Sequence, residues 1–205
     1  MILEFFVTFV MRTVLSIVLL VGLAACDRGS GEAGQEFADD QAQEEGETIE
    51  SGQGMVGKLD ISQRGTAMVD TTFQAPDGST VRLSDFTGKP LLVNIWATWC
   101  APCIVEMPML DKLAAREKER LKVLVVSQDI QGAEKVVPFF ERGDFQELEP
   151  YVDPENGLSF GFGSGLMPTT VLYDAQGQEV WRVIGAMDWD GAKAAALLEE
   201  TLSAR

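Results

Sequence analysis

Hydrophobic residues in this chain gather in short runs that have the spacings of strands and helices. The run at residues 91–96, Leu-Leu-Val-Asn-Ile-Trp, is almost continuously apolar, which is typical of a strand covered on both faces of a sheet. From Pro102 to about Glu119, apolar residues recur at helical spacing with charged residues between them, which predicts an amphipathic helix. Together the two patterns predict a buried strand that leads directly into a helix.

The remaining apolar pattern predicts one α/β domain with a mixed central sheet and helices on both faces. Short apolar runs predict further strands at residues 69–73, 80–83, 121–127, 151–153, 171–173 and 179–184. One-sided apolar spacing predicts helices at residues 132–142 and 190–202. Turn-forming residues, Pro-Asp-Gly and Asp-Ala-Gln-Gly, join two of the strand pairs, so we expect each of these pairs to form a hairpin.

Two of the three cysteines lie between the strand at 91–96 and its helix, in the sequence Trp-Cys-Ala-Pro-Cys. Cys100 and Cys103 fall in the first helical turn, close enough for one disulfide. The free N–H groups and the positive dipole end of a helix N-terminus stabilise a thiolate, which is the reactive form of cysteine. We therefore predict that Cys100, the exposed residue, attacks a substrate disulfide, and that the shielded Cys103 resolves the mixed disulfide.

Glu106 lies three residues after Cys103 and therefore on the same face of the predicted helix. A carboxylate at this position could accept the proton of the resolving thiol, or raise the pKa of that thiol by like-charge repulsion. The alternative is that Glu106 only complements the helix dipole.

Other uses of a Cys-x-x-Cys pair fit this chain less well. A structural zinc site needs four ligands, usually including a second pair or histidines, and the sequence has no histidine and only one further cysteine. We therefore predict no metal site. A purely structural disulfide is also disfavoured, because a 205-residue chain with 46% hydrophobic residues can build a core without one. Two thiolates can hold Cu(I), so a copper-binding or partner-docking module stays open as an alternative.

The residues around the cysteines resemble a known family. Val-Asn-Ile-Trp-Ala-Thr at 93–98, followed by Trp-Cys-Ala-Pro-Cys-x-x-Glu-x-Pro, is similar to membrane-tethered thioredoxin-like proteins of the TlpA/ResA type, which are thiol:disulfide interchange proteins. The resemblance covers roughly residues 65–202. It implies a thioredoxin-like fold with an N-terminal β-hairpin and an insertion after the second core strand, and no cofactor. It also implies that Cys100 is the nucleophile, Cys103 the resolving cysteine and Glu106 the acidic residue that tunes them.

The same resemblance implies that Pro168 is a cis-proline that faces the disulfide. A cis bond after Met167 would leave the Met167 backbone free to pair with an extended substrate strand, whereas the plainer interpretation is a proline at a strand edge. Trp99, next to the nucleophile, is expected to belong to the substrate platform, to the core, or to both. Asn94 stands where thioredoxin has a buried aspartate, which moves the expected proton transfer to Glu106 or to water.

Residues 1–26 have the pattern of a targeting segment. The uncharged stretch at 13–25 ends in Leu-Ala-Ala-Cys, which resembles the lipobox of bacterial lipoproteins, so Cys26 is expected to carry the lipid of the mature chain. Met11 is then the expected translation start, with Arg12 as the positive residue. Alternatively, residues 5–25 stay attached and span the bilayer as a helix. In either case we expect a domain held to the periplasmic face of a membrane.

Residues 27–54 are strongly acidic and lack apolar periodicity. They contain nine acidic residues against Arg28 alone, a composition that cannot bury a core and predicts a disordered tether. Residues 55–205 then form the thioredoxin-like domain. This part has 22 acidic and 14 basic residues, and its net negative charge argues against nucleic acid or anionic lipid as a partner.

The residues between the cysteines predict the direction of electron transfer. Strong disulfide oxidants stabilise their reduced form, typically through a very low thiol pKa. Ala101 and Pro102 offer no group for this, and Glu106 disfavours nearby negative charge. We therefore predict a reductase of protein disulfides, with an oxidase or isomerase as the alternative. The resemblance implies apocytochrome c or copper-centre assembly proteins as clients, and a membrane thiol transporter as electron donor.

Overall fold

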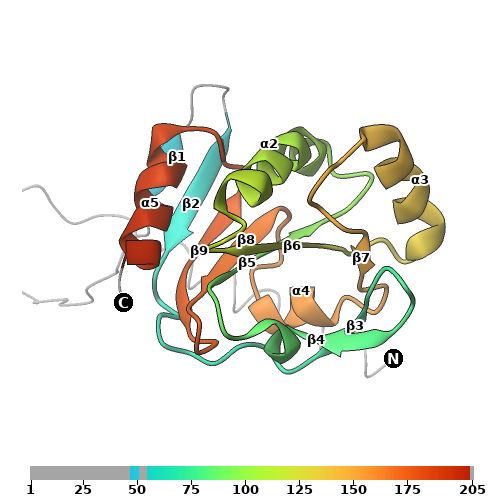
Figure 1. Ribbon diagram of the computed structural model, residues 1–205, viewed down its shortest axis with the longest axis horizontal. Helices are drawn as coiled ribbons and strands as arrows, with labels where there is room; N and C mark the ends of the chain where they lie inside the picture. Colours follow the sequence, from blue (N-terminus) through green and yellow to red (C-terminus); the bar gives the residue numbers. More distant parts are fainter. Residues whose placement is uncertain (1–46, 51–54, 204–205) are drawn as a thin grey trace, which may run out of the picture. The chain divides into compact units, whose positions relative to one another are not determined.

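Strand β5 (Leu91–Trp96), the continuous apolar run, lies in the middle of the sheet. The computed structural model describes residues 47–50 and 55–203 (Figure 1). β5 pairs in parallel with β6 (Lys122–Ser127) on one side and antiparallel with β8 (Thr169–Tyr173) on the other. All six residues of β5 are buried, as expected for a strand covered on both faces.

The described residues form one mixed sheet of nine strands in the order β1-β2-β9-β8-β5-β6-β7-β3-β4. The strands not yet given are β1 (Thr48–Glu50), β2 (Val56–Asp60), β3 (Thr72–Gln74), β4 (Thr80–Arg82), β7 (Tyr151–Val152) and β9 (Glu179–Gly185). The helices are η1 (Leu83–Phe86), α2 (Ala101–Glu117), α3 (Ala133–Gly143), α4 (Gly157–Phe162) and α5 (Ala192–Ser203).

Helices cover both faces of the sheet (Figure 1). α2, α3 and α5 lie on one face, where Leu92 of β5 belongs to the same buried cluster as Leu110 and Leu198. α4 and η1 lie on the other face, where Ile95 of β5 belongs to a second cluster with Leu158. Because side chains alternate along a strand, β5 contributes to both cores. The predicted fold, a mixed sheet flanked by helices, is confirmed.

The predicted elements occur with small shifts at their ends. The helix expected from residue 102 to about 119 is α2, and the helix expected at 132–142 is α3. The short strand expected at 151–153 is β7, which pairs in parallel with β6. β3 and β4 form the expected hairpin. α3, β7 and α4 make up the segment between β6 and β8, where the resemblance implies an insertion.

The N-terminal segment differs from the prediction where the structure describes it. The sequence predicts a disordered tether at residues 27–54, but Thr48–Glu50 form β1, which pairs antiparallel with β2. Ile49 is only 3% exposed, because its side chain packs into the cluster beneath α2 and α5. The predicted end of the tether is therefore wrong. Residues 27–46 and 51–54 of that range, the targeting segment 1–26 and Cys26 lie outside the described residues. Within the described ranges, no helix has both the length and the hydrophobicity to cross a membrane.

A buried ion pair fastens β9 to the face of the sheet that α4 covers. Arg182 Nε and Nη2 each donate to the Glu179 carboxylate at 2.6 Å, and Arg182 Nη1 donates to the Phe162 carbonyl at 2.5 Å. Arg182 is 7% exposed and Glu179 is 3% exposed. A buried charge that loses its partner is costly, so each of the two side chains depends on the other.

We expect Arg182→Ala to lower the free energy of unfolding by about 3–5 kcal/mol, because it leaves the Glu179 carboxylate buried without its cation. Glu199→Ala is the control, because it breaks the exposed Arg120–Glu199 pair, and it should cost about 0–1 kcal/mol. Urea unfolding followed by circular dichroism measures both values. Similar losses in the two variants would contradict a structural role for the buried pair.

Candidate redox site

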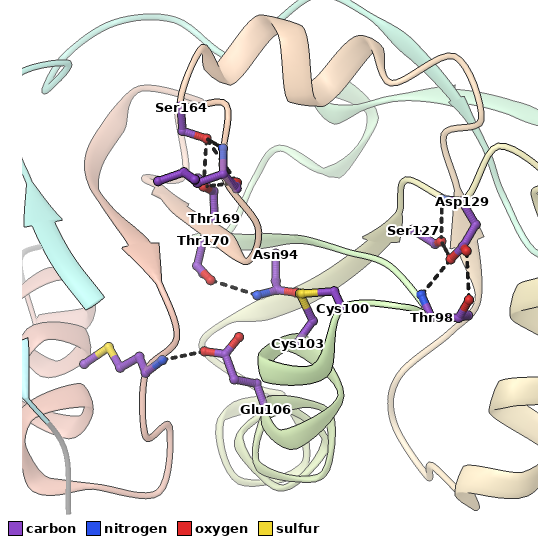
Figure 2. Close-up of a disulfide and its surroundings, with 12 residues drawn as sticks. Asn94, Thr98, Cys100, Cys103, Glu106, Ser127, Asp129, Ser164, Thr169 and Thr170 are labelled. Carbon is purple, nitrogen blue, oxygen red and sulfur yellow. Dashed lines mark hydrogen bonds between the residues drawn. A yellow bond between two sulfur atoms is a disulfide. The ribbon is translucent and has the colours of Figure 1, made fainter. Parts of the chain in front are cut away.

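Helix α2 begins at the end of β5, and the two cysteines occupy its first turn. Cys100 is the N-cap residue, and Pro102 follows in the first turn, where a missing backbone N–H costs little. The Cys100 N–H donates to the Ala97 carbonyl at 3.0 Å, and the Ile104 N–H donates to the Cys100 carbonyl at 3.1 Å. Cys100 and Cys103 form a disulfide with their Cα atoms 5.3 Å apart (Figure 2). The pair therefore stands where the apolar pattern predicts it.

The two cysteines differ in exposure. Cys100 is 6% exposed and Cys103 is 1% exposed, so Cys100 is the outer residue of the pair. The expectation that Cys100 is the exposed residue of the pair therefore holds only relative to Cys103, because Cys100 is itself largely buried and its sulfur is bonded to that of Cys103. Cys100 becomes free to react with a client only when this bond is reduced.

The Glu106 side chain lies on the interior side of the disulfide, one helical turn below Cys103 (Figure 2). It is fully buried. Its Oε1 accepts hydrogen bonds from the Met187 N–H at 2.6 Å and from the Trp189 indole N–H at 2.9 Å. Its Oε2 is buried and has no hydrogen-bond partner among the described residues. This position favours a role in the redox site over that of a solvated residue that complements the helix dipole.

Burial raises the pKa of Glu106 to about 8, because a carboxylate loses its hydration inside the protein. The hydrogen bonds from Met187 and Trp189, together with the polar Asn94 side chain nearby, lower the pKa and are smaller effects. Near neutral pH the group is therefore mostly protonated. Of the two roles that the sequence suggests, proton exchange fits this state better than like-charge repulsion, which needs an ionised carboxylate.

Asn94 lies on β5 and faces the same part of the interior. Its Nδ2 donates to Thr170 Oγ1 at 2.9 Å across the β5–β8 pair. Both residues are buried. An amide has no proton to exchange at physiological pH, so Glu106 is the titratable side chain here, in agreement with the expectation that Asn94 displaces proton transfer to Glu106 or water.

Asp129 holds the loop before Cys100, and sequence reasoning did not single it out. Its Oδ2 and Oδ1 accept hydrogen bonds from the Thr98 N–H and the Thr98 hydroxyl, both at 2.8 Å (Figure 2). The Ser127 hydroxyl also donates to Oδ2 at 2.8 Å, and Asp129 is 1% exposed. The sequence feature that points to Asp129 is the change from apolar to polar residues where the predicted strand at 121–127 ends.

The Met167–Pro168 peptide bond is cis, as the resemblance implies. The following Thr169 hydroxyl donates to the Leu166 carbonyl at 2.8 Å, and the Gly185 N–H donates to the Pro168 carbonyl at 2.9 Å. Hydrogen bonds thus fix this loop at both ends. A role of Met167 and Pro168 in substrate binding stays a prediction.

Exposed apolar side chains occur on three loops of the site. Trp99 is 69% exposed, Ile130 is 77% exposed and Leu166 is 59% exposed. The alternative that Trp99 belongs to the core is therefore wrong. Each residue is next to one already placed: Trp99 precedes Cys100, Ile130 follows Asp129, and Leu166 lies in the loop that leads to the cis-proline.

The groups that the site brings together are two cysteine sulfurs and one buried carboxyl. Among the described residues, no group of three or more His, Cys, Asp or Glu side chains is arranged to hold a metal ion.

A dithiol in the first turn of a helix that follows a central strand, with a cis-proline at the start of the adjacent strand, defines a thioredoxin-like protein. The profile of the Redoxin family matches residues 63–198, and the chain belongs to this family. The prediction of a TlpA/ResA-like member of the thioredoxin family is confirmed.

Three similar proteins illustrate the relationship. The thiol-disulfide oxidoreductase ResA of Oceanobacillus iheyensis is 38% identical over 115 residues, which cover 56% of this chain and 59% of that protein. A candidate thiol:disulfide interchange protein DsbE from Chlorobium tepidum has a similar fold, with a TM-score of 0.61 at 24% identity, over 68% of this chain and 97% of its own. The exposed lipoprotein thioredoxin of Streptococcus pneumoniae has a TM-score of 0.54 at 28% identity, over 63% and 98% of the two chains. The family and the disulfide together support the predicted class of activity, thiol–disulfide exchange.

We expect the stability of the oxidised protein to fall as the pH rises from about 5 to 8, and Glu106→Gln to remove most of this fall. The folded state keeps the Glu106 proton up to about pH 8, whereas the unfolded state releases it near its ordinary value. Folding therefore loses about 1.4 kcal/mol per pH unit across this window. The glutamine keeps an oxygen for Met187 and Trp189 but cannot titrate. Guanidinium unfolding at a series of pH values measures the difference, and two parallel stability curves would contradict the raised pKa.

Proposed function

We propose that this protein is a membrane-tethered thiol:disulfide reductase that acts on protein disulfides at the periplasmic face of the membrane. The observation that carries the proposal is the Cys100–Cys103 disulfide at the start of α2, with the buried carboxyl of Glu106 one turn below it. This arrangement supplies a nucleophile, a resolving thiol and a group that exchanges protons near neutral pH.

The exchange begins from the reduced protein. The Cys100 thiolate attacks one sulfur of the client disulfide, forms a mixed disulfide and releases the other client sulfur as a thiolate. Cys103 then gives its proton to the ionised fraction of Glu106 and attacks the Cys100 sulfur. The mixed disulfide breaks, the second client sulfur leaves as a thiolate, and the client has gained the two electrons that the protein has lost. A dithiol donor reverses these steps to restore the protein.

Glu106 suits the proton-transfer step because of its environment. A general base works best when its pKa is close to the working pH, and burial raises the pKa of Glu106 to about 8. The unpartnered Oε2 is the oxygen that remains available for a proton, since Oε1 already accepts two hydrogen bonds.

The limited stabilisation of the Cys100 thiolate at the helix end supports a reductase rather than an oxidase. The Cys100 thiolate gains stabilisation from the first-turn N–H groups, but the intervening residues Ala101 and Pro102 carry no hydrogen-bonding side chain. A strong oxidant requires a reduced form that is stabilised much further. The predicted donor is a membrane thiol transporter, because an oxidising compartment does not supply electrons.

Exposed apolar side chains on the loops of the site support a protein as the client. Trp99, Ile130 and Leu166 offer exposed apolar area, and the backbone at Met167 is proposed to pair with an extended client segment. Apocytochrome c and copper-centre assembly proteins are the proposed clients, by resemblance to the TlpA/ResA type.

The sequence near the N-terminus supports membrane attachment. Leu-Ala-Ala-Cys at 23–26 resembles a lipobox, and the similar pneumococcal thioredoxin is an exposed lipoprotein. We propose lipidation of Cys26 as the anchor, with a membrane-spanning helix at residues 5–25 as the alternative.

We expect Cys103→Ser to form a stable mixed disulfide with a client, because Cys100 can still attack but no thiol resolves the product. With insulin as the model client and dithiothreitol as donor, the wild type should accelerate reduction. The variant, reduced beforehand and freed of dithiothreitol before insulin is added, should carry an insulin chain, because dithiothreitol itself would cleave the mixed disulfide. Mass spectrometry detects the adduct. Cys100→Ser is the matched control and should form none. Absence of the adduct in Cys103→Ser, or an equal adduct in Cys100→Ser, would refute the assigned roles.

We expect millimolar glutathione to leave the Cys100–Cys103 disulfide mostly oxidised, while dithiothreitol reduces it. A reductase needs a potential well below that of the strong oxidants, so its disulfide resists the weaker monothiol reductant. Trapping of free thiols with maleimide, followed by mass spectrometry, measures the reduced fraction. Ready reduction by glutathione alone would favour the oxidase or isomerase.

A further inference from the structure

The β1–β2 hairpin packs beside the segment of chain that holds Glu106. β2 pairs antiparallel with β9, with Gly57 opposite Gly185 and Lys58 opposite Ile184. β9 ends at Gly185, and Met187, the donor to Glu106, follows two residues later. Since β2 is the neighbour of β9 on this side of the sheet, the hairpin covers an edge that β9 would otherwise expose.

Two glycines allow the backbones to approach closely at this point. A Cβ atom at Gly185 would lie 2.6 Å from the Val56 carbonyl oxygen, and Gly185 has φ +97°, which favours glycine. A Cβ atom at Gly57 would lie 2.7 Å from Val183 Cγ1 and 3.0 Å from the Ala186 carbonyl oxygen. The hairpin is therefore in tight contact with the end of β9 and with the residue just before Met187.

Residues 185–187 connect two parts of the redox site, the cis-proline loop and Glu106. The Gly185 N–H donates to the Pro168 carbonyl at 2.9 Å, and the Met187 N–H donates to Glu106 Oε1 at 2.6 Å. The hairpin packs against the opposite side of the same short segment. A displacement of residues 185–187 would therefore move the donor away from Glu106.

Side chains of the hairpin also belong to the buried cluster around the site. Ile49 is 3% exposed and Met55 is 8% exposed. Both lie in one cluster with Cys103, Met187 and Trp189. This part of the core, which excludes water from the interior side of the disulfide, is thus partly built from the N-terminal end of the domain.

We propose that the β1–β2 hairpin is a positioning element of the redox site, which holds residues 185–187 against Glu106 and keeps water from its carboxyl group. The structural effect of the hairpin does not depend on the proposed function. Only its consequence for catalysis does, because that requires Glu106 to exchange protons with Cys103. It connects the end of the N-terminal segment to the proton-exchanging group of the site.

The charged groups on the adjoining elements are engaged elsewhere. Lys58 on β2 is exposed, Asp188 accepts a hydrogen bond from the Asp190 N–H, and Lys193 on α5 pairs with Glu47. On its own helix, the titratable neighbour of Glu106 is Cys103, which is oxidised. The raised pKa of Glu106 comes from burial, and its polar neighbours Met187, Trp189 and Asn94 are neutral, so entry of water is expected to lower the pKa.

The test compares two glycine substitutions in the oxidised, full-length protein. Gly57→Ala pushes the hairpin away from Val183 and Ala186. Gly157→Ala is the matched control, because its Cβ would lie 2.4 Å from Thr71 Oγ1, next to β3 at the other side of the sheet. The infrared C=O band of the protonated carboxyl, identified by its loss in Glu106→Gln, reports the titration of Glu106. We expect Gly57→Ala to lower the pH midpoint of the Glu106 titration by about one pH unit or more, which means that the proton binds about tenfold more weakly. Gly157→Ala should leave this midpoint unchanged.

An unchanged midpoint in folded Gly57→Ala, or an equal shift in both variants, would overturn the proposal. If Gly57→Ala does not fold, Ile49→Ala replaces it as a milder change that loosens the hairpin. The pH midpoint of the Glu106 titration must then be lower in Ile49→Ala than in the wild type. Insulin reduction measured as a function of pH separates the positioning role of the hairpin from the catalytic role of Glu106. If the infrared midpoint moves in Gly57→Ala while the pH profile of turnover does not, the hairpin has the proposed effect and the catalytic role of Glu106 is wrong.

Discussion

The hydrogen bonds that Glu106 accepts from Met187 and Trp189 join the two halves of the redox site. One half is the first two turns of α2, which carry both cysteines and the carboxyl. The other half is the chain that leaves β9, which also bonds to the loop of Pro168. Because Glu106 is fully buried, these N–H groups replace the water that a carboxyl group would otherwise bind. The disulfide, the cis-proline loop and the end of β9 are therefore packed as one unit.

The central strand and the redox helix could be predicted because their information is local. A continuous apolar run and a helical spacing define β5 and α2, and the cysteines lie between them in the sequence. The position of Glu106 followed from three-residue spacing along the same helix. Its donors could not be predicted in this way, because Met187 and Trp189 lie 81 and 83 residues further along the chain. No periodicity connects positions that the fold alone brings together.

Two features that the sequence interpretation did not predict, β1 and the role of Asp129, have the same physical origin. Acidic residues surround β1, so composition predicts a tether there, but a three-residue strand needs only a partner strand and one buried side chain, here Ile49. Asp129 was overlooked because a polar residue after a strand is usually solvated. In this fold the adjacent β5 brings Thr98 within reach of its carboxylate. In both cases a tertiary contact outweighs the preference expected from local composition.

Two glutamates are buried in the part of the chain that the structure describes, and they show how the surroundings decide what a carboxyl group can do. Glu179 faces the Arg182 guanidinium group, which gives it two charge-assisted hydrogen bonds at 2.6 Å. This pairing holds Arg182 where it donates to the Phe162 carbonyl at the end of α4. Glu106 faces only neutral donors among the described residues, and burial raises its pKa to about 8. A cation beside Glu106 would hold it ionised and unable to keep a proton at neutral pH. A dry pocket with neutral donors is thus what allows a carboxyl group to exchange protons with a neighbouring thiol, and its walls come from α2, from the end of β9 and from the N-terminal hairpin.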